Sequence, residues 1–349
     1  MNVAAASPVL SDLASPSAGS GTPHGNDPRS LVVADVGGTF ARLALAETTP
    51  GQTPRLGSYR TYACADHPSL AAILADFTAS LGQPVSTAVV AIAGLLDGDV
   101  LINANLPWTV SLSTTRAQSG LQKLQLINDF EAVALAIPYL QADTLVPLNG
   151  DADPAQAFPA LVLGAGTGLG AALWIPTPHG PVVLPTEAGQ PTLAASTELE
   201  MAIVRHMQRD RAHVSIEHAL SGPGLMNLYH AICALQGQTP VLASPDAVTA
   251  AAMAGTDALA RQALDVFCGL LGSTIGDMAL FYGAQGGVYL AGGILPQIRE
   301  YLHASTFVER YLQKGPMGEA LARIPVKVVE HGQLGVIGAA SWFLLHANA

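Results

Sequence analysis

The chain has 349 residues, of which 50% are hydrophobic and only 12% are charged. This length is typical of two domains, and the composition supplies enough apolar residues for two cores. The net charge is -11 and the lysines are few, which argues against a nucleic-acid-binding surface: Lys123, Lys314 and Lys327. A phosphate ligand must therefore be held mostly by backbone amides, a metal ion and a few arginines.

The cysteines and the N-terminal segment indicate the cellular compartment in which the protein is expected. Cys64, Cys233 and Cys268 have no metal-binding or redox spacing, so we expect packing positions in a reducing compartment. No run of about 18 apolar residues lacks Gly, Pro and polar interruptions, and no membrane span is expected. Residues 1–29 are rich in Ala, Ser, Pro and Gly and lack the basic start and apolar core of a signal peptide. They are predicted to form a disordered tail.

Residues 31–45 read as an apolar strand, a polar glycine turn and a second apolar strand. Gly37 and Gly38 permit backbone angles closed to other residues and let a ligand approach the main chain. Asp35 lies just ahead of the turn on an apolar strand, an unfavourable place for a carboxylate unless it binds something. An ordinary hairpin with a surface Asp is the alternative interpretation.

The next part of the chain alternates strands and helices. Asn128 and Asp129 open a helix that Pro138 ends, and a helix cap alone would account for either residue. The pair nevertheless follows the carboxyl end of a strand, where open α/β sheets place ligands. We predict strands at 58–63, 87–93, 100–104 and 124–127, and helices at 68–81 and 113–121.

Residues 161–175 repeat the design of the first hairpin. Two strand–glycine–strand hairpins, one in each half, suggest a duplicated fold whose halves face a shared cleft. Gly166, Gly168 and Ala171 also fit the dinucleotide motif G-x-G-x-x-A, but a strand is predicted to follow where that motif needs a helix. The dinucleotide interpretation is therefore rejected.

The second half continues as a mixed α/β pattern. Glu217 reads equally well as a surface acid or a site residue, and residues 221–223 as a helix start or a ligand contact. Residues 331–338 lead into a last helix whose Gly and Ala content suits close packing. We predict a polar loop at 186–190, helices around 199–207, 225–235, 246–254 and 257–281, and strands at 286–291 and 326–330.

With these blocks in view, the chain resembles the bacterial glucokinases of the hexokinase–actin–Hsp70 superfamily from about residue 31 to 346. No single block decides the resemblance, but all of them occur in family order and at family-like intervals. The blocks are residues 35–39, 41–43, 127–130, 164–170, 187–189, 220–225, 227–229, 286–288 and 291–294.

The resemblance implies an α/β fold of two ribonuclease-H-like, actin-like ATPase domains around a cleft. The small domain would be 30–139 plus 331–349 and the large domain 140–330, after the tail at 1–29. The implied activity is that of a glucokinase, which transfers the γ-phosphoryl group of ATP to the 6-hydroxyl of glucose with Mg²⁺ at the entry to glycolysis. A cytoplasmic homodimer is implied, without nucleic-acid or membrane partners.

The resemblance also assigns roles to residues. Asp129 would be the catalytic base, and Asp35 would lie near the magnesium through water. The sugar partners would be Asn105, Asn128, Asp129, Glu187, Gln190 and Glu217. The nucleotide would be held by Ala34, Asp35, Val36, Gly37, Gly38, Thr39, Gly164, Gly166, Thr167, Gly168, Ser221, Gly222, Gly224, Gly292 and Gly293.

The chain departs from the family pattern on the expected sugar side. Phe40 stands where the family usually has Asn, Gln190 where it has His, and residues 93–96 lack a familiar proline. We therefore predict a sugar kinase whose hexose preference or catalytic efficiency differs from that of the family. The alternatives are a catalytically weakened sugar-binding regulator, a kinase for another hexose, and an acyl or amino-sugar kinase. The Asn128–Asp129 pair disfavours acyl phosphates, because an acid substrate needs no base.

Overall fold

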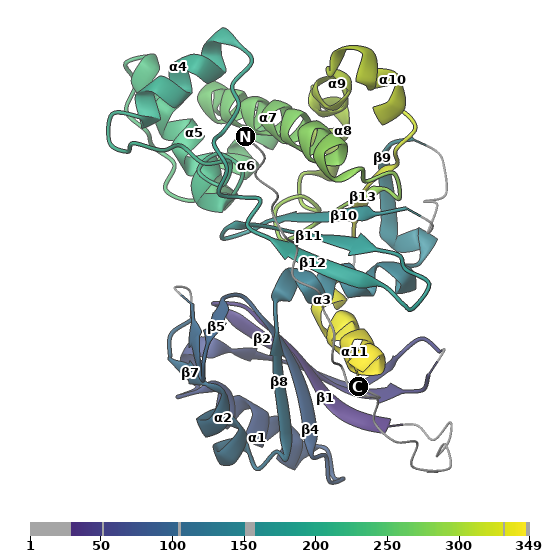
Figure 1. Ribbon diagram of the computed structural model, residues 1–349. Coiled ribbons are helices and arrows are strands. Elements are labelled where there is room, and N and C mark those ends of the chain that lie inside the picture. The colour runs from purple at the N-terminus through teal and green to yellow at the C-terminus, as the bar shows by residue number, and fades with distance from the viewer. Residues whose placement is uncertain (1–28, 51, 104–105, 151–157, 331, 347–349) are drawn as a thin grey trace, which may run out of the picture.

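The computed structural model describes residues 29–50, 52–103, 106–150, 158–330 and 332–346, so the predicted tail at 1–28 lies outside it. Two mixed α/β halves lie one above the other, and helices α3 (Asp129–Ala136) and α11 (Leu334–His346) lie between their sheets (Figure 1). The predicted fold class, α/β with two sheets around a cleft, is confirmed.

The first sheet has the strand order β3-β2-β1-β4-β8. β1 pairs antiparallel with β2 and parallel with β4, so the predicted first hairpin is present. α1 (Leu70–Ser80) and α2 (Leu112–Ser119) flank the sheet, and α11 packs on its opposite face. The strands are β1 (Arg29–Val36), β2 (Phe40–Thr48), β3 (Arg55–Ala63), β4 (Thr87–Ile92) and β8 (Lys123–Ile127), beside a small sheet of β5 (Leu95–Asp97), β6 (Val100–Ile102) and β7 (Val110–Ser111).

The second sheet has the order β12-β11-β10-β13-β14-β9. β10 pairs antiparallel with β11 and parallel with β13, which repeats the pairing of β1 and supports the predicted duplication. The strand that follows the glycine turn also confirms the rejection of the dinucleotide motif. The strands are β9 (Leu145–Asn149), β10 (Ala160–Ala165), β11 (Leu169–Ile175), β12 (Val182–Thr186), β13 (Val288–Ala291) and β14 (Val326–Val329).

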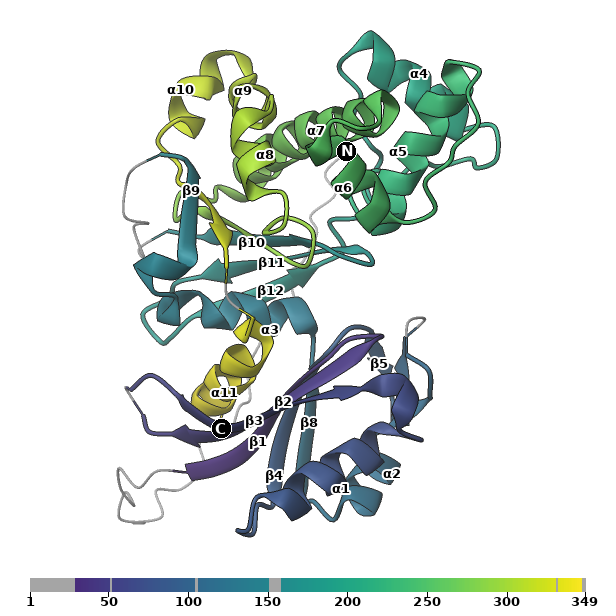
Figure 2. The same ribbon diagram turned by 180° about the vertical axis from the view of Figure 1, so that it is seen from behind.

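Helices cover the outer face of the second sheet (Figure 2). The longest, α7, is long and apolar enough to span a membrane, but 78% of its most apolar window is buried in the core of this half. Glu200 and Arg310 form a buried ion pair of 2.6 Å that joins α4 to α9. The helices are α4 (Glu198–Met207), α5 (Gly222–Leu235), α6 (Pro245–Ala254), α7 (Ala258–Tyr282), α8 (Arg299–Ala304), α9 (Phe307–Leu312) and α10 (Gly318–Leu321).

Four edge strands were not predicted: β5 and β7 of the small sheet, and β9 and β12 of the second sheet. Strands β9 and β12 each contain a proline, Pro147 and Pro185, which breaks the sequence signal of a strand. Proline is tolerated at these positions because an edge strand leaves one row of its amides unpaired with a neighbour.

Helix α3 packs closely on the second hairpin because the Phe130 ring occupies the space that side chains at two glycines would fill. Gly164 and Gly170 are direct partners across β10 and β11. A Cβ atom at Gly164 would lie 2.8 Å from the Phe130 ring, and one at Gly170 only 2.0 Å from it. On the other side of α3, a Cβ at Gly338 of α11 would lie 1.7 Å from the Ala132 carbonyl oxygen. The predicted close packing of the last helix is confirmed, and α3 is fixed from both sides.

We propose domain boundaries near residues 139–140 and 330–331, as the sequence predicts. Support comes from the cores: separate apolar clusters fill the first half and the helix-covered side of the second. The layer of α3 and α11 contacts both sheets, because one cluster joins it to β1 and β4 and another joins it to β10 and β13.

Gly170→Ala should destabilise the protein by about 1–3 kcal/mol, because the added methyl group overpacks the Phe130 ring. Urea unfolding checks this, with Gly57→Ala on β3 as the control, since a Cβ at Gly57 meets nothing within 4 Å. In a Phe130→Leu background the cost of Gly170→Ala should shrink. An equal cost in both backgrounds would show that the ring is not the obstacle.

Candidate functional site

A cleft of about 760 Å³ lies between the two halves. Both hairpins, the start of α3 and the start of α11 contribute to its walls. The predicted site residues that line it are Asp35, Asn128, Asp129, Gly164, Gly166, Thr167, Gly168, Glu187, Glu217, Gly292 and Gly293.

Three segments meet at the turn between β10 and β11. The turn is closed by a hydrogen bond from the Gly166 amide to the Gly168 carbonyl oxygen, 2.8 Å. The Gly222 amide, at the start of α5, donates to the Gly166 carbonyl oxygen at 2.7 Å. Gly292 has a left-handed φ of 92°, and a Cβ there would lie 2.6 Å from the Ala165 carbonyl oxygen. Glycine at 292 is therefore required both by its backbone angle and by this close approach.

The turn of the first hairpin is built differently from the expectation. The Gly37 amide donates to the Phe40 carbonyl oxygen at 2.9 Å, and the Cys64 thiol donates to the Gly37 carbonyl oxygen at 3.4 Å. Neither Gly37 nor Gly38 has a positive φ, so special backbone angles do not explain these glycines. A Cβ at Gly37 would meet only the Phe40 oxygen, 3.7 Å away. Because Gly37 and Gly38 have no side chains, the backbone of this turn is open to a ligand. Such an approach to the main chain was expected from the sequence.

Asp35 lies on β1, directly opposite Arg42 of β2, and faces the cleft. The Arg42 guanidinium is 3.7 Å from its carboxylate. A Cβ at Gly335, in the first turn of α11, would lie 2.5 Å from the Asp35 carboxyl carbon. Burial raises the pKa of Asp35 above its ordinary value, and Arg42 partly opposes this effect.

Asn128 and Asp129 divide two roles at the start of α3. The Asn128 side chain caps the helix, because its oxygen accepts from the amides of Phe130, at 2.9 Å, and Glu131, at 3.1 Å. Asp129 is therefore not needed as the cap and faces the cleft. Burial is the main cause that raises the pKa of Asp129 to about 6; the charges of Asp35 and Glu187 contribute to this rise, and the Phe130 amide opposes it. Such a carboxylate is poised to exchange a proton near neutral pH.

Two further acids enclose the cleft from the second half. Glu217 is held by the Leu169 amide, which donates to its Oε2 at 2.8 Å. Its other oxygen, Oε1, lies 3.5 Å from the Gln190 side-chain amide. Glu187 follows β12, and the backbone amide of Gln190 donates to the backbone carbonyl oxygen of Glu187 at 3.0 Å. The loop that carries Glu187 and Gln190 is thus tied to Glu217.

Several predicted site residues lie beside the cleft and do not line it. Asn105 lies outside the described residues. Gln190 and Phe40 are exposed. The buried or turn residues Ala34, Val36, Gly37, Gly38, Thr39, Ser221, Gly222 and Gly224 surround the two glycine turns without lining the cleft.

Arg42 and Glu330 are charged cleft residues that we did not assign from the sequence. Arg42 is the one cation among the described residues that line the cleft, which also include five acids: Asp35, Asp129, Glu187, Glu217 and Glu330. Its position seven residues after Asp35 was the available signal, because partners across a tight hairpin face the same side.

The acids of the cleft suit a magnesium ion that is shared with phosphates. No cluster of three or more His, Cys, Asp or Glu side chains that could hold a metal occurs in the described part of the chain. Mg²⁺ commonly binds through one or two carboxylates, substrate phosphates and water, which Asp35 at the cleft wall can satisfy. Asp35 therefore fits the metal-side role that the sequence predicts.

Comparison with known proteins identifies the family. The sequence profile of the glucokinase family matches residues 32–346. The chain belongs to the glucokinase family. A glucokinase-like protein from Xylella fastidiosa (strain 9a5c) is 56% identical over 318 residues, covering 90% of this chain and 95% of that protein. A glucokinase from Saccharophagus degradans is 39% identical over 320 residues, covering 89% of this chain and 97% of its own.

A solved structure agrees with this membership. The crystal structure of a glucokinase from an Antarctic psychrotroph is 34% identical, with a TM-score of 0.80, and the match covers 91% of this chain and 99% of that one. The predicted resemblance to the bacterial glucokinase family is therefore confirmed.

Replacing Asp129 should stabilise the protein at neutral pH. The folded pKa of about 6 exceeds the ordinary value of 3.8. Between these two pH values the folded state therefore retains a proton that the unfolded chain releases. Stability attributable to Asp129 is therefore present at low pH and lost as the pH rises through about 6. Asp129→Asn, neutral throughout, should gain in melting temperature relative to wild type between pH 5 and pH 7.5.

Asp143→Asn is the matched control, because it removes an exposed carboxylate away from the cleft. An Asp129→Asn variant that is less stable than wild type at pH 7.5, with the control unchanged, would contradict the burial of an ionisable carboxylate at this position.

Proposed function

We propose that the chain is a glucokinase that transfers the γ-phosphoryl group of ATP to the 6-hydroxyl of glucose. The observation that carries the proposal is the position of Asp129, a half-buried carboxylate with a raised pKa at the cleft, next to the glycine turn of β10 and β11. Membership of the glucokinase family supports the same reaction. Homodimerisation and a cytoplasmic location are carried over from the family and belong to this proposal.

The proposed roles follow from chemistry. Phosphoryl transfer depends chiefly on positioning and on neutralising charge at the phosphates. The amides of the two glycine turns would cradle the phosphates, and Gly222, Gly292 and Gly293 border the second of these turns, on the side proposed for adenosine. When bound at Asp35, Mg²⁺ supplies charge neutralisation. Arg42 is the described cation that could add to it.

Asp129 would accept the proton of the sugar hydroxyl as that oxygen attacks. Asn128, Glu187 and Glu217 would bind the remaining hydroxyl groups, which need polar partners because an unpaired buried hydroxyl costs about 1–3 kcal/mol. Glu217 is already oriented by the hydrogen bond from the Leu169 amide, so it can accept a hydrogen bond from a sugar hydroxyl without a change of rotamer. Asn105 belongs to this proposed set by family position alone.

Asp129→Asn should lower hexose-dependent ADP release by about 10²–10⁴-fold, because the general base is lost while its shape is kept. Nucleotide binding should be nearly unchanged, which fluorescence titration with a labelled ATP analogue checks. Asp143→Asn, which loses a carboxylate outside the cleft, should retain wild-type turnover. Full activity of Asp129→Asn would refute the assigned base.

The pH dependence offers an independent test of the same residue. Because Asp129 must be ionised to accept a proton, kcat/KM should fall about tenfold per pH unit below about 6. Measurement of kcat/KM for glucose from pH 5 to pH 8 checks this. A profile that stays flat down to pH 5 would exclude a group with this pKa as the base.

A kinase for another hexose is the second candidate, and the exposed Gln190 favours it. Its side-chain amide lies 3.5 Å from Glu217 and outside the residues that line the cleft, whereas the family residue at this position is His. ADP release with glucose, mannose, fructose and N-acetylglucosamine should therefore be compared. Glucose is expected to give the highest kcat/KM. A higher value for another sugar would transfer the proposal to that sugar.

The same assay separates the kinase from a sugar-binding regulator. A regulator would release no ADP with any sugar, although glucose would still raise its melting temperature. That combination would overturn the proposed enzyme, whereas sugar-dependent ADP release would exclude a purely regulatory role.

A further inference from the structure

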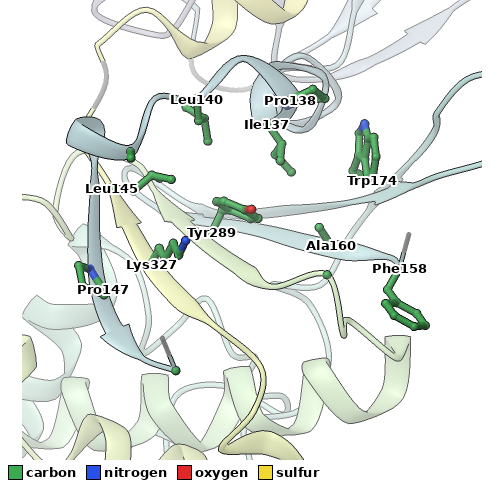
Figure 3. Close-up of a pocket in the computed structure, with 13 residues that line it drawn as sticks. Ile137, Pro138, Leu140, Leu145, Pro147, Phe158, Ala160, Trp174, Tyr289 and Lys327 are labelled. Atoms are coloured by element: carbon green, nitrogen blue, oxygen red, sulfur yellow. The ribbon is translucent and has the colours of Figure 1, made fainter. Parts of the chain in front are cut away.

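A second cavity, of about 670 Å³, opens on the same face of the second sheet as α3, at the far end of that helix from the cleft (Figure 3). Asp129 and Phe130 at the start of α3 line the cleft, whereas Ile137 and Pro138, directly after its end, line this second cavity. Its volume falls within the range of about 300–1,000 Å³ that is typical of small-molecule sites. No residue that we placed in the glucokinase site lines it.

Most side chains that line the cavity are apolar, and they come from both the sheet and the chain that crosses it. Trp174 of β11, Tyr289 of β13 and Leu145 of the edge strand β9 belong to the sheet, and Leu140 lies on the chain that crosses it after α3 (Figure 3). Trp174 is only 8% exposed and Tyr289 only 4%, so these rings form a fixed wall. Such a surface favours an apolar or aromatic body.

Lys327 provides a positive charge at the floor of the cavity. It lies on β14 directly beside Tyr289 of β13, and it is the one charged side chain among the described residues that line the cavity. It is half-buried and forms no ion pair with any described residue. By contrast, Lys314 is paired with Asp277 at 2.8 Å. A half-buried ammonium group beside apolar walls favours an anionic partner.

A second donor in the same wall lacks an acceptor. The Trp174 Nε1 atom is buried and has no hydrogen-bond partner within the described part of the chain. A buried donor left unpaired destabilises the folded state, and few are tolerated in folded proteins. The Trp174 ring therefore lines the cavity while its N–H is enclosed by protein, and the Lys327 ammonium group is the charged group of a cavity without any acid among its described lining residues.

We propose that this cavity is a binding site for a small organic anion with one carboxylate on an apolar body. The carboxylate would pair with Lys327, and the body would lie against Trp174 and Tyr289. Because α3 connects this cavity to the cleft, the occupant is also coupled to ligands of the cleft. The helix spans only Asp129–Ala136, so about two helical turns separate Asp129 at the cleft from Ile137 and Pro138 at the cavity.

Phenylacetate and its neutral counterpart phenylacetamide are suitable probes, because they differ only in the charged group. In the full chain labelled with ¹⁵N at its three tryptophans, phenylacetate should shift the Trp174 indole signal and leave those of Trp108 and Trp342 in place. The Trp174 signal is assigned by its loss in Trp174→Phe. The dissociation constant of phenylacetamide should be higher, on the order of tenfold or more, since a charge-assisted hydrogen bond is missing.

Variants at Lys327 show whether its charge is the cause. Lys327→Met should weaken phenylacetate binding about tenfold or more, whereas Lys327→Arg should retain it. Lys123→Met, at an exposed position on β8, is the control and should bind as wild type. An unmoved Trp174 signal, or equal affinity in Lys327→Met and wild type, would overturn the proposed site.

The coupling through α3 rests on the proposed function, because it uses glucose as the ligand of the cleft. Saturating glucose should change the dissociation constant of phenylacetate on the order of fivefold or more. Thermal shift measured with glucose alone separates the two failures. No stabilisation by glucose counts against the proposed function and leaves the indole measurement decisive for the site, whereas stabilisation with unchanged phenylacetate affinity overturns the coupling.

Discussion

The packing of the Phe130 ring against the second hairpin is the constraint on which the rest of the structure depends. The ring occupies the space left by Gly164 and Gly170, and no larger residue fits at either position. This contact places the start of α3 against the glycine turn of β10 and β11, so Asp129 lies beside the backbone proposed to hold the phosphates. Gly338 fixes the other side of α3 to α11, and Gly335 brings α11 against Asp35. Four glycines on three elements thus hold both acids of the proposed mechanism. Gly164, which the sequence suggested as a phosphate contact, has a packing role that is independent of any ligand.

The electrostatics of the cleft follow from this packing. Five acids and one arginine are the charged groups among its described lining residues, and the charges of Asp35 and Glu187 contribute to the raised pKa of Asp129. Burial raises the pKa of both Asp35 and Asp129, but different groups oppose the effect: Arg42 at Asp35 and the Phe130 amide at Asp129. An acidic cleft is suited to a neutral sugar and to a nucleotide that arrives with its metal ion. The cost is stability, since an ionised Asp129 in this position opposes folding at neutral pH.

Much of this architecture could be predicted from residue patterns. The two hairpins, α1, α3, α7 and the parallel strands β4 and β8 carry clear periodicity or apolar runs, and the pairing of glycine turns indicated a shared cleft. Asp129 was identifiable from its position after the carboxyl end of a strand and from the family resemblance, and the structure adds that Asn128 supplies the cap. The edge strands β9 and β12 were missed because their prolines are compatible only with an edge, and nothing local says where the edge is. Arg42 was missed as a site residue, because its importance comes from the register of β1 and β2. The link between Phe130 and two glycines 34 and 40 residues away has no local signal at all, since it depends on tertiary packing.

The most direct test of the central claim, that Asp129 is the base for a hexose hydroxyl, is a crystal structure with glucose and a non-hydrolysable ATP analogue. The account predicts that the 6-hydroxyl lies within hydrogen-bond reach of the Asp129 carboxylate, about 2.6–3.2 Å, with the γ-phosphate against the turn of Gly166 and Gly168. A sugar bound with its 6-hydroxyl directed away from Asp129, or a nucleotide whose phosphates lie away from both glycine turns, would contradict it.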